Sequence, residues 1–225
     1  MPLREFIQAA YERGSMPAED GAPWALMPHS ITAESGAALR DLAQAERASR
    51  TLEIGLALGI GTLWLCEALE DLEGAQHVTL DPLNRQGFGG TGLRAIREAG
   101  IESLVEVVEE ESQTELPRMI RERREFDLAY VDGDHRFESA FLDVYFCGRL
   151  VRPGGVIIVD DLQLPALRAV LDYFETNMGY ERVSGVLPDE YHRDALRRPR
   201  GRMAVLRVPV DPPERRWDSY ESFGT

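Results

Sequence analysis

Three short acidic motifs, each at the end of an apolar run typical of a β-strand, carry the residues best suited to chemistry. They are Glu53-Ile54-Gly55 with Gly59 and Gly61, Asp132-Gly133-Asp134-His135, and Asp160-Asp161. Open parallel α/β sheets bind ligands at the carboxyl ends of their strands, where loops distant in sequence converge. The motifs are therefore expected to share one cleft, with a nucleotide-like cofactor beside a group of carboxylates.

The first motif indicates a cofactor turn. Glycines after a strand let backbone N–H groups approach a ligand, and the next helix adds a positive N-terminus. The spacing of Gly55, Gly59 and Gly61 differs from the dinucleotide pattern G-x-G-x-x-G, and a purely structural tight turn is the alternative. Asp81, at the end of the next predicted strand, could accept both ribose hydroxyls and so favours a nucleoside site.

The second motif indicates the reaction type. Asp132 ends an apolar strand and His135 follows three residues later, so one turn can bring a carboxylate and an imidazole into the cleft. An imidazole with its ordinary pKa of about 6.5 suits a general base at neutral pH. We expect Asp134 to be the N-cap of a helix that begins near Arg136. The alternative for His135 is an exposed place in the first turn of that helix.

The third motif completes a carboxylate group. Asp160 and Asp161 follow the most apolar strand, and Pro165 marks the first residue of the next helix, too far on for either acid to cap it. Adjacent carboxylates need a cation or water to screen them. With Asp132 they form a set of hard oxygen ligands that suits Mg²⁺ or Mn²⁺ rather than Zn²⁺.

The order of elements predicts a doubly wound α/β fold. Strands are expected at residues 51–55, 77–81, 104–109, 126–132, 156–160, 180–186 and 203–208. Helices fill most intervals, which favours a mostly parallel seven-stranded sheet. The last two strands have no long helix between them and should form an antiparallel hairpin at one edge.

The rest of the chain is expected to form a cover over this sheet and a tail after it. Residues 1–50 should form a helical cover, with helices at 3–13 and 32–48, residues 51–208 the cofactor-binding domain, and residues 209–225 an irregular tail. The glycine-rich segment 87–92 suggests a substrate lid or a plain connector. Tyr191, His192 and Trp217 are candidates for the substrate pocket or for the surface. His29 is expected near a helix cap, and His77 needs no functional role.

Composition narrows the function classes. The formal net charge is −14, which argues against a nucleic-acid substrate. The chain contains Arg but no Lys, which excludes lysine chemistry. No apolar run approaches the roughly 20 residues that span a bilayer, so we expect a cytoplasmic protein. Cys66 and Cys147 lie in apolar helical contexts and are expected to be buried. Apolar residues of the N-terminal helices and the tail allow a homodimer.

Because of the order and spacing of these motifs, the chain resembles the Rossmann-like S-adenosylmethionine-dependent methyltransferases over about residues 51–161. The resemblance implies that the cofactor is bound by Glu53, Gly55, Gly59, Gly61, Asp81, Ser112, Gln113 and Asp132. Ser112-Gln113 matches an adenine-side pair of the catechol O-methyltransferase branch. That branch binds a metal at matching positions. Where this chain has Asp160 and Asp161, the branch has an acid and an amide, and where this chain has His135, the branch has a Lys base. Macrolide-sugar O-methyltransferases place a His at the base position and acids in the metal set.

These features together predict a metal-dependent O-methyltransferase. Its acceptor would be a small molecule with adjacent oxygens, such as a catechol, a sugar diol or a hydroxy acid, with natural-product tailoring as a context. His135 would be the base and Asp132, Asp160 and Asp161 the metal ligands. The alternatives are a metal-independent small-molecule methyltransferase and, more distantly, an NAD-dependent dehydrogenase or a non-catalytic cofactor-binding protein.

Overall fold

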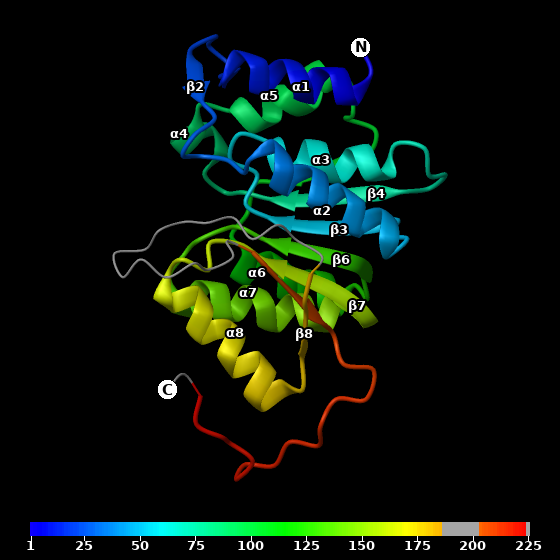
Figure 1. The fold of residues 1–225 in the computed structure, drawn as a ribbon, viewed down its shortest axis with the longest axis vertical. Coiled ribbons are helices and arrows are strands. Elements are labelled where there is room, and N and C mark those ends of the chain that lie inside the picture. The colour runs from blue at the N-terminus through cyan, green and yellow to red at the C-terminus, as the bar shows by residue number, and fades with distance from the viewer. Residues whose placement is uncertain (186–202, 224–225) are drawn as a thin grey trace.

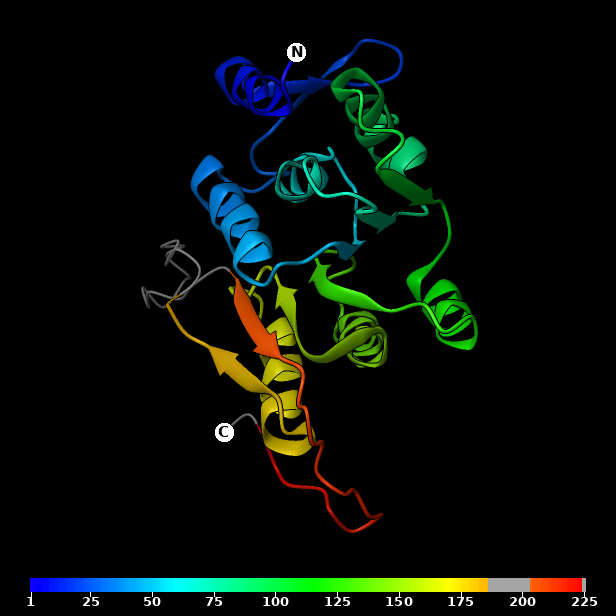
Figure 2. The same ribbon diagram turned by 90° about the vertical axis from the view of Figure 1, so that its right-hand side faces the viewer.

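A seven-stranded sheet forms the centre of the fold in the computed structural model, which describes residues 1–185 and 203–223 (Figure 1). Its order is β5-β4-β3-β6-β7-β9-β8, and the first five of these strands are parallel. The strands are β3 (Arg50–Ile54), β4 (Gln76–Leu80), β5 (Val105–Val108), β6 (Phe126–Val131), β7 (Val151–Val159), β8 (Glu181–Val183) and β9 (Ala204–Arg207). β9 pairs antiparallel with β7 and β8, which confirms the predicted edge hairpin (Figure 2).

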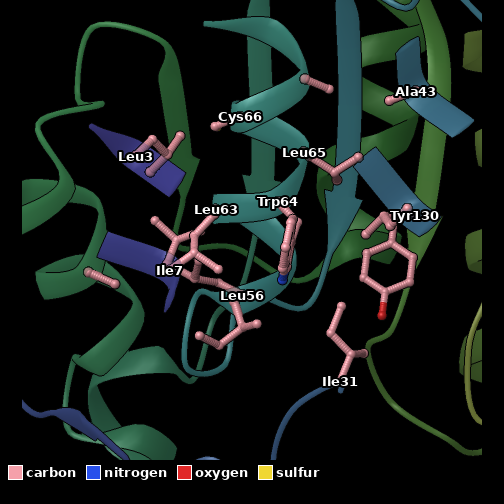
Figure 3. Packing of buried hydrophobic residues seen from close by; sticks show 14 of the residues in the cluster. Leu3, Ile7, Ile31, Ala43, Leu56, Leu63, Trp64, Leu65, Cys66 and Tyr130 are labelled. Atoms are coloured by element: carbon pink, nitrogen blue, oxygen red, sulfur yellow. The ribbon is translucent and has the colours of Figure 1, made fainter. Parts of the chain in front are cut away.

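Helices cover both faces of the sheet. Their bounds are α1 (Leu3–Arg13), α2 (Ala33–Ala45), α3 (Ile60–Leu69), α4 (Asn84–Phe88), α5 (Thr91–Ala99), α6 (Ser112–Arg121), α7 (Phe137–Leu150) and α8 (Pro165–Met178). Helices α1, α2, α3 and α5 share one apolar cluster, and α6, α7 and α8 share the other. Leu3, Ile7, Trp64 and Tyr130 lie in the first cluster (Figure 3). The N-terminal helices are therefore part of the core that supports the sheet.

The start of β7 differs from the prediction. The strand begins at Val151, directly after α7, rather than after Pro153-Gly154-Gly155. Val151 pairs with Phe126 and the register then shifts before Leu128, as in a β-bulge. Gly155 permits this irregularity, since a Cβ there would lie 2.6 Å from the carbonyl oxygen of Asp127.

Two segments expected to be irregular contain secondary structure. Between α1 and α2 lies a hairpin of β1 (Ser15–Pro17) and β2 (Pro23–Ala25). The glycine-rich segment forms α4 and the start of α5 rather than a loop, and the chain reverses at Gly89 and Gly90, whose φ angles are 59° and 71°. Glycine adopts these angles without a Cβ clash.

The tail after β9 is irregular, as expected, and lies along α8. The Asn177 side chain exchanges two hydrogen bonds with the backbone of Glu221, and the Tyr173 and Phe223 rings are 5.3 Å apart between centroids. Trp217 is 93% exposed. Among the described residues, no helix combines the length and apolarity that a membrane crossing requires.

Candidate functional site

A cavity of about 600 Å³ lies at the carboxyl ends of β3, β4, β6 and β7. It is lined by seven of the predicted site residues, Gly55, Asp81, Ser112, Gln113, Asp132, His135 and Asp161. They reach the same space because each follows a parallel strand or begins the helix after one. The expectation of one shared cleft therefore agrees with the tertiary structure.

Asp132, His135 and Asp161 form the charged side of the cavity. One ligand atom from each lies within 4.8 Å of the other two. His135 Nε2 donates a hydrogen bond to Asp161 Oδ2 at 2.7 Å, and the distance from Nε2 to Asp132 Oδ1 is 3.8 Å. Asp161 has a φ of 57°, so the chain turns sharply after Asp160. Consecutive aspartates therefore face different surroundings.

The Asp132 and Asp161 carboxylates raise the pKa of His135 to about 10, against the opposite effect of partial burial. Asp161 is the nearer of the two to Nε2, at 2.7 Å against 3.8 Å for Asp132. The side chain of His135 is 45% exposed, so it is open to a ligand in the cavity. At neutral pH the imidazole is therefore cationic beside these two acids.

Asp160 lies beneath this group. Its Oδ2 accepts a hydrogen bond from the Tyr130 hydroxyl at 2.6 Å, and its Oδ1 accepts one from the Asp161 N–H at 2.6 Å. The same hydroxyl lies 3.1 Å from Asp132 Oδ2. Asp160 is 1% exposed and does not line the cavity. The structure thus joins Asp132, His135 and Asp161, whereas the sequence predicted Asp132, Asp160 and Asp161.

Glu53 belongs to a sealed network. Its carboxylate accepts hydrogen bonds from Thr62 Oγ1 and, at 3.1 Å, from His77 Nε2. The Thr51 hydroxyl lies 2.8 Å from His77 Nδ1. His77 therefore has a structural role in this network. Glu53 lines only a smaller neighbouring cavity.

The glycines of the first motif are required by the protein itself. A Cβ on Gly55 would lie 2.1 Å from the carbonyl oxygen of Asp132, and a Cβ on Gly61 would lie 2.5 Å from Glu53 Oε1. Gly55 and Gly59 also have positive φ angles of 100° and 82°. Gly55 lines the main cavity, while Gly59 lines neither. Close packing accounts for these glycines whether or not a cofactor is bound.

Asp81 connects the glycine turn to the cavity. Its Oδ2 accepts the Ala57 N–H at 2.9 Å, and its Oδ1 accepts the Leu83 N–H at 2.9 Å. Asn84, which the sequence did not single out, donates to the carbonyl of Ala57 at 2.7 Å and to Asp81 Oδ2 at 3.1 Å. Two carboxylate oxygens have about four lone-pair sites, so Asp81 keeps acceptor capacity for a ribose hydroxyl.

Asp134 caps the following helix less directly than predicted. The N-cap of α7 is Arg136, without a side-chain cap. Asp134 Oδ1 accepts the Arg136 N–H at 3.2 Å, and its Oδ2 accepts the Ser139 hydroxyl at 2.9 Å. The side-chain hydrogen bond from Arg136 lowers the pKa of Asp134. Asp134 therefore stabilises the turn that carries His135.

Sequence reasoning missed two parts of the cavity wall. Asp143 lies on the buried stripe of α7 with Ala140, Val144 and Cys147, so an acid at an apolar helical position was the available signal. His29 and Phe88 line the opening, with ring centroids 6.4 Å apart. Thr32 caps α2, three residues after His29. Trp217 does not line the cavity, and Tyr191 and His192 lie outside the described residues.

The donor sets fit the groups that the resemblance implies. Two carboxylates and an imidazole that meet within 4.8 Å suit a divalent cation. For a nucleoside, the cavity offers Asp81 beside Leu80 and Pro82, and Ser112 with Gln113.

The comparisons with known proteins show which family this chain is similar to. Residues 52–162 match the family model described as a methyltransferase domain. A caffeoyl-CoA O-methyltransferase of Populus kitakamiensis is 30% identical over 134 residues, 59% of this chain and 54% of that protein. A catechol O-methyltransferase of Mycobacterium tuberculosis is 29% identical over 133 residues, 59% and 57% of the two chains. The chain thus aligns with little more than half of these relatives.

A solved structure supports the fold across nearly the whole chain. The O-methyltransferase from Bacillus cereus, in complex with SAH, matches with a TM-score of 0.62 and 20% identity, covering 91% of this chain and 90% of that one. The matched segment is thus similar to a methyltransferase domain, and the fold is the one that this O-methyltransferase structure has. The relatives described above are O-methyltransferases of the catechol and caffeoyl-CoA type.

Proposed function

We propose that this protein is a divalent-metal-dependent O-methyltransferase that uses S-adenosylmethionine and acts on a small molecule with adjacent oxygens. The observation that carries the proposal is the meeting of Asp132, His135 and Asp161 on the wall of the cavity that also contains Asp81. Its O-methyltransferase relatives and a neighbour solved with SAH support the reaction class and the methyl donor. Catechols, sugar diols and hydroxy acids are acceptors of the required kind.

Each side of the cavity has a separate task. Asp81 would hold the ribose, and Asp132 and Asp161 would hold the cation, while Asp160 would orient Asp161 through the hydrogen bond from its N–H. When bound, the donor supplies a methyl group on a positively charged sulfur and the cation lowers the pKa of a coordinated hydroxyl. Holding the acceptor oxygen in line with that methyl group is the main contribution of the protein, and alignment can supply roughly 7–11 kcal/mol.

His135 would receive the hydroxyl proton at Nε2, the atom that now bonds Asp161. A cationic imidazole cannot accept a proton. The pKa of His135 is raised by Asp132 and Asp161, so a base role requires another positive charge to take over these carboxylates. This requirement is a physical argument for metal dependence.

Turnover after removal of metal tests the proposal. The protein is treated with EDTA, desalted, and assayed with S-adenosylmethionine and a catechol in the presence or absence of Mg²⁺. We expect activity only when Mg²⁺ is restored, because His135 then loses its proton near neutral pH. Full activity in EDTA would contradict the metal requirement.

The hydrogen bond of 2.7 Å between His135 and Asp161 favours one alternative, a metal-independent methyltransferase. In that case Asp161 orients the imidazole directly, as a carboxylate does in a catalytic triad. Activity in EDTA that rises with pH toward the raised pKa of His135 would support it.

A further inference from the structure

A glutamine in the loop between β7 and α8 holds the oxygen of Asp161 that His135 does not contact. Gln163 Nε2 donates a hydrogen bond to Asp161 Oδ1, while Asp161 Oδ2 accepts one from His135 Nε2 at 2.7 Å. His135 lines the cavity and Gln163 does not. The two oxygens of one carboxylate therefore have different partners, one on the cavity wall and one within the protein.

The orientation of this amide leaves its own oxygen unsatisfied. Gln163 Oε1 is buried and has no hydrogen-bond partner among residues 1–185 and 203–223. Buried polar atoms without a partner are rare in folded proteins, so this one needs an explanation. If the amide were turned over, its oxygen would face a carboxylate, which only accepts hydrogen bonds when ionised. The bond to Asp161 therefore decides which way the amide points.

The backbone around Gln163 is held by separate contacts. Arg168, near the start of α8, donates from Nη1 to the carbonyl oxygens of Leu162 at 2.7 Å and of Gln163 at 2.9 Å. The Leu164 N–H donates to the carbonyl oxygen of Asp161 at 2.9 Å. Because these contacts fix the loop, the amide stays beside the carboxylate whether or not a ligand is bound.

We propose that Gln163 is a specificity-determining residue of the cation site, which keeps Asp161 Oδ1 from the cation and so favours Mn²⁺ or Mg²⁺ over Ca²⁺. The proposal rests on the proposed function, in which Asp132 and Asp161 hold the cation. With Oδ1 engaged by the amide, Asp161 supplies one ligand atom, Oδ2, in place of two.

The coordination chemistry of the ions gives this difference its effect. Ca²⁺ takes about six to eight oxygen ligands and often uses both oxygens of one carboxylate. Mg²⁺ and Mn²⁺ prefer about six ligands in an octahedron, to which a carboxylate contributes a single oxygen. A carboxylate restricted to one oxygen therefore disfavours the larger ion.

The test titrates Ca²⁺ against Mn²⁺ bound to the whole protein, with free Mn²⁺ measured by electron paramagnetic resonance. Wild type should bind Mn²⁺ more tightly than Ca²⁺. Q163M keeps the chain length but has no N–H group, so both oxygens of Asp161 become available. The preference for Mn²⁺ should then fall by about 10-fold, mainly through tighter Ca²⁺ binding. Q44M, the same change at an exposed position of α2, should keep the wild-type preference.

The outcomes separate this inference from the proposed function. A loop that is merely loosened would bind both cations more weakly by the same factor. An unchanged preference, or the loss of both cations, in folded Q163M would therefore overturn the role of Gln163 alone. No Mn²⁺ binding to wild type would overturn the metal requirement as well. Should Q163M fail to fold, wild type decides, because Ca²⁺ bound as tightly as Mn²⁺ would contradict the inference and a preference for Mn²⁺ would support it.

Discussion

Two acid–histidine pairs in this molecule have similar chemistry and opposite surroundings. Glu53 and His77 are 1% and 0% exposed, and Thr51 and Thr62 complete their hydrogen bonds. Asp161 and His135 are closer, at 2.7 Å, but the side chain of His135 is 45% exposed and faces a cavity. The buried pair stabilises the fold, whereas the open pair can exchange a proton with a ligand. Access, rather than residue type, separates their roles.

Replacement of His135 by Gln should have the largest effect. Loss of a general base typically lowers kcat by about 10²- to 10⁴-fold. The affinity for S-adenosylhomocysteine should change by less than about threefold, since His135 serves the acceptor side. Steady-state kinetics and calorimetry measure the two quantities. Unchanged kcat would remove His135 from the mechanism and leave both pairs as structural features.

The two neighbouring aspartates should differ in metal affinity. D161N should weaken Mn²⁺ binding by more than about 100-fold, because Asp161 lies in the candidate group. D160N should weaken it by about 10-fold, as expected of a residue that orients ligands. Mn²⁺ titration followed by electron paramagnetic resonance measures both, with D134N as a charge-matched control. Equal losses would instead support the three-carboxylate set predicted from sequence.

Replacement of His77 by Ala tests the sealed pair. It leaves Glu53 buried without its imidazole donor, at a cost of about 2 kcal/mol of unfolding free energy and ~6 °C in Tm. Thermal unfolding without ligand measures this change. H29A removes an exposed histidine and should shift the unfolding free energy by no more than about 0.5 kcal/mol. A loss of activity in H77A without loss of stability would contradict the purely structural role.

The smallest effect concerns pH in metal-free protein. The pKa of His135 is raised from 6.5 to about 10, so its pairing contributes stability that is fully present below pH 6.5. That contribution is lost as the pH rises toward 10. NMR titration of His135 should show a midpoint near 10 in wild type and a lower one in D161N. An ordinary midpoint in both proteins would mean that Asp161 does not hold the imidazole in solution.

Local patterns predicted most of the fold. Helix α7 and the start of α8 at Pro165 were predicted correctly, because apolar periodicity and a proline at the first helical position are local signals. The β1–β2 hairpin and the early start of β7 were missed. The early start of β7 depends on the pairing of Val151 with Phe126, which local patterns do not show. The β1–β2 hairpin consists of two three-residue strands, which are too short to show an alternating pattern.

Part of the candidate site could likewise be predicted from the sequence, and part of it could not. Asp81, Asp132 and His135 could be placed in one cleft because strand ends of a parallel sheet converge. The separate surroundings of Asp160 and Asp161 depend on the positive φ of Asp161 and on Tyr130, a buried neighbour from another strand. The distance from Asp143 to Ser112 likewise depends on how α6 packs against α7.

By itself, the sequence determined the alternation of strands and helices, the parallel sheet and the acids at its carboxyl edge. Apolar periodicity encodes the elements, and the position of each acid directly after a strand encodes its place at that edge. Only the tertiary structure decided which acid–histidine pair is sealed and which is open. Burial, hydrogen-bond partners and pKa shifts come from residues that meet across the sheet, and such contacts leave no signal in the spacing of one chain.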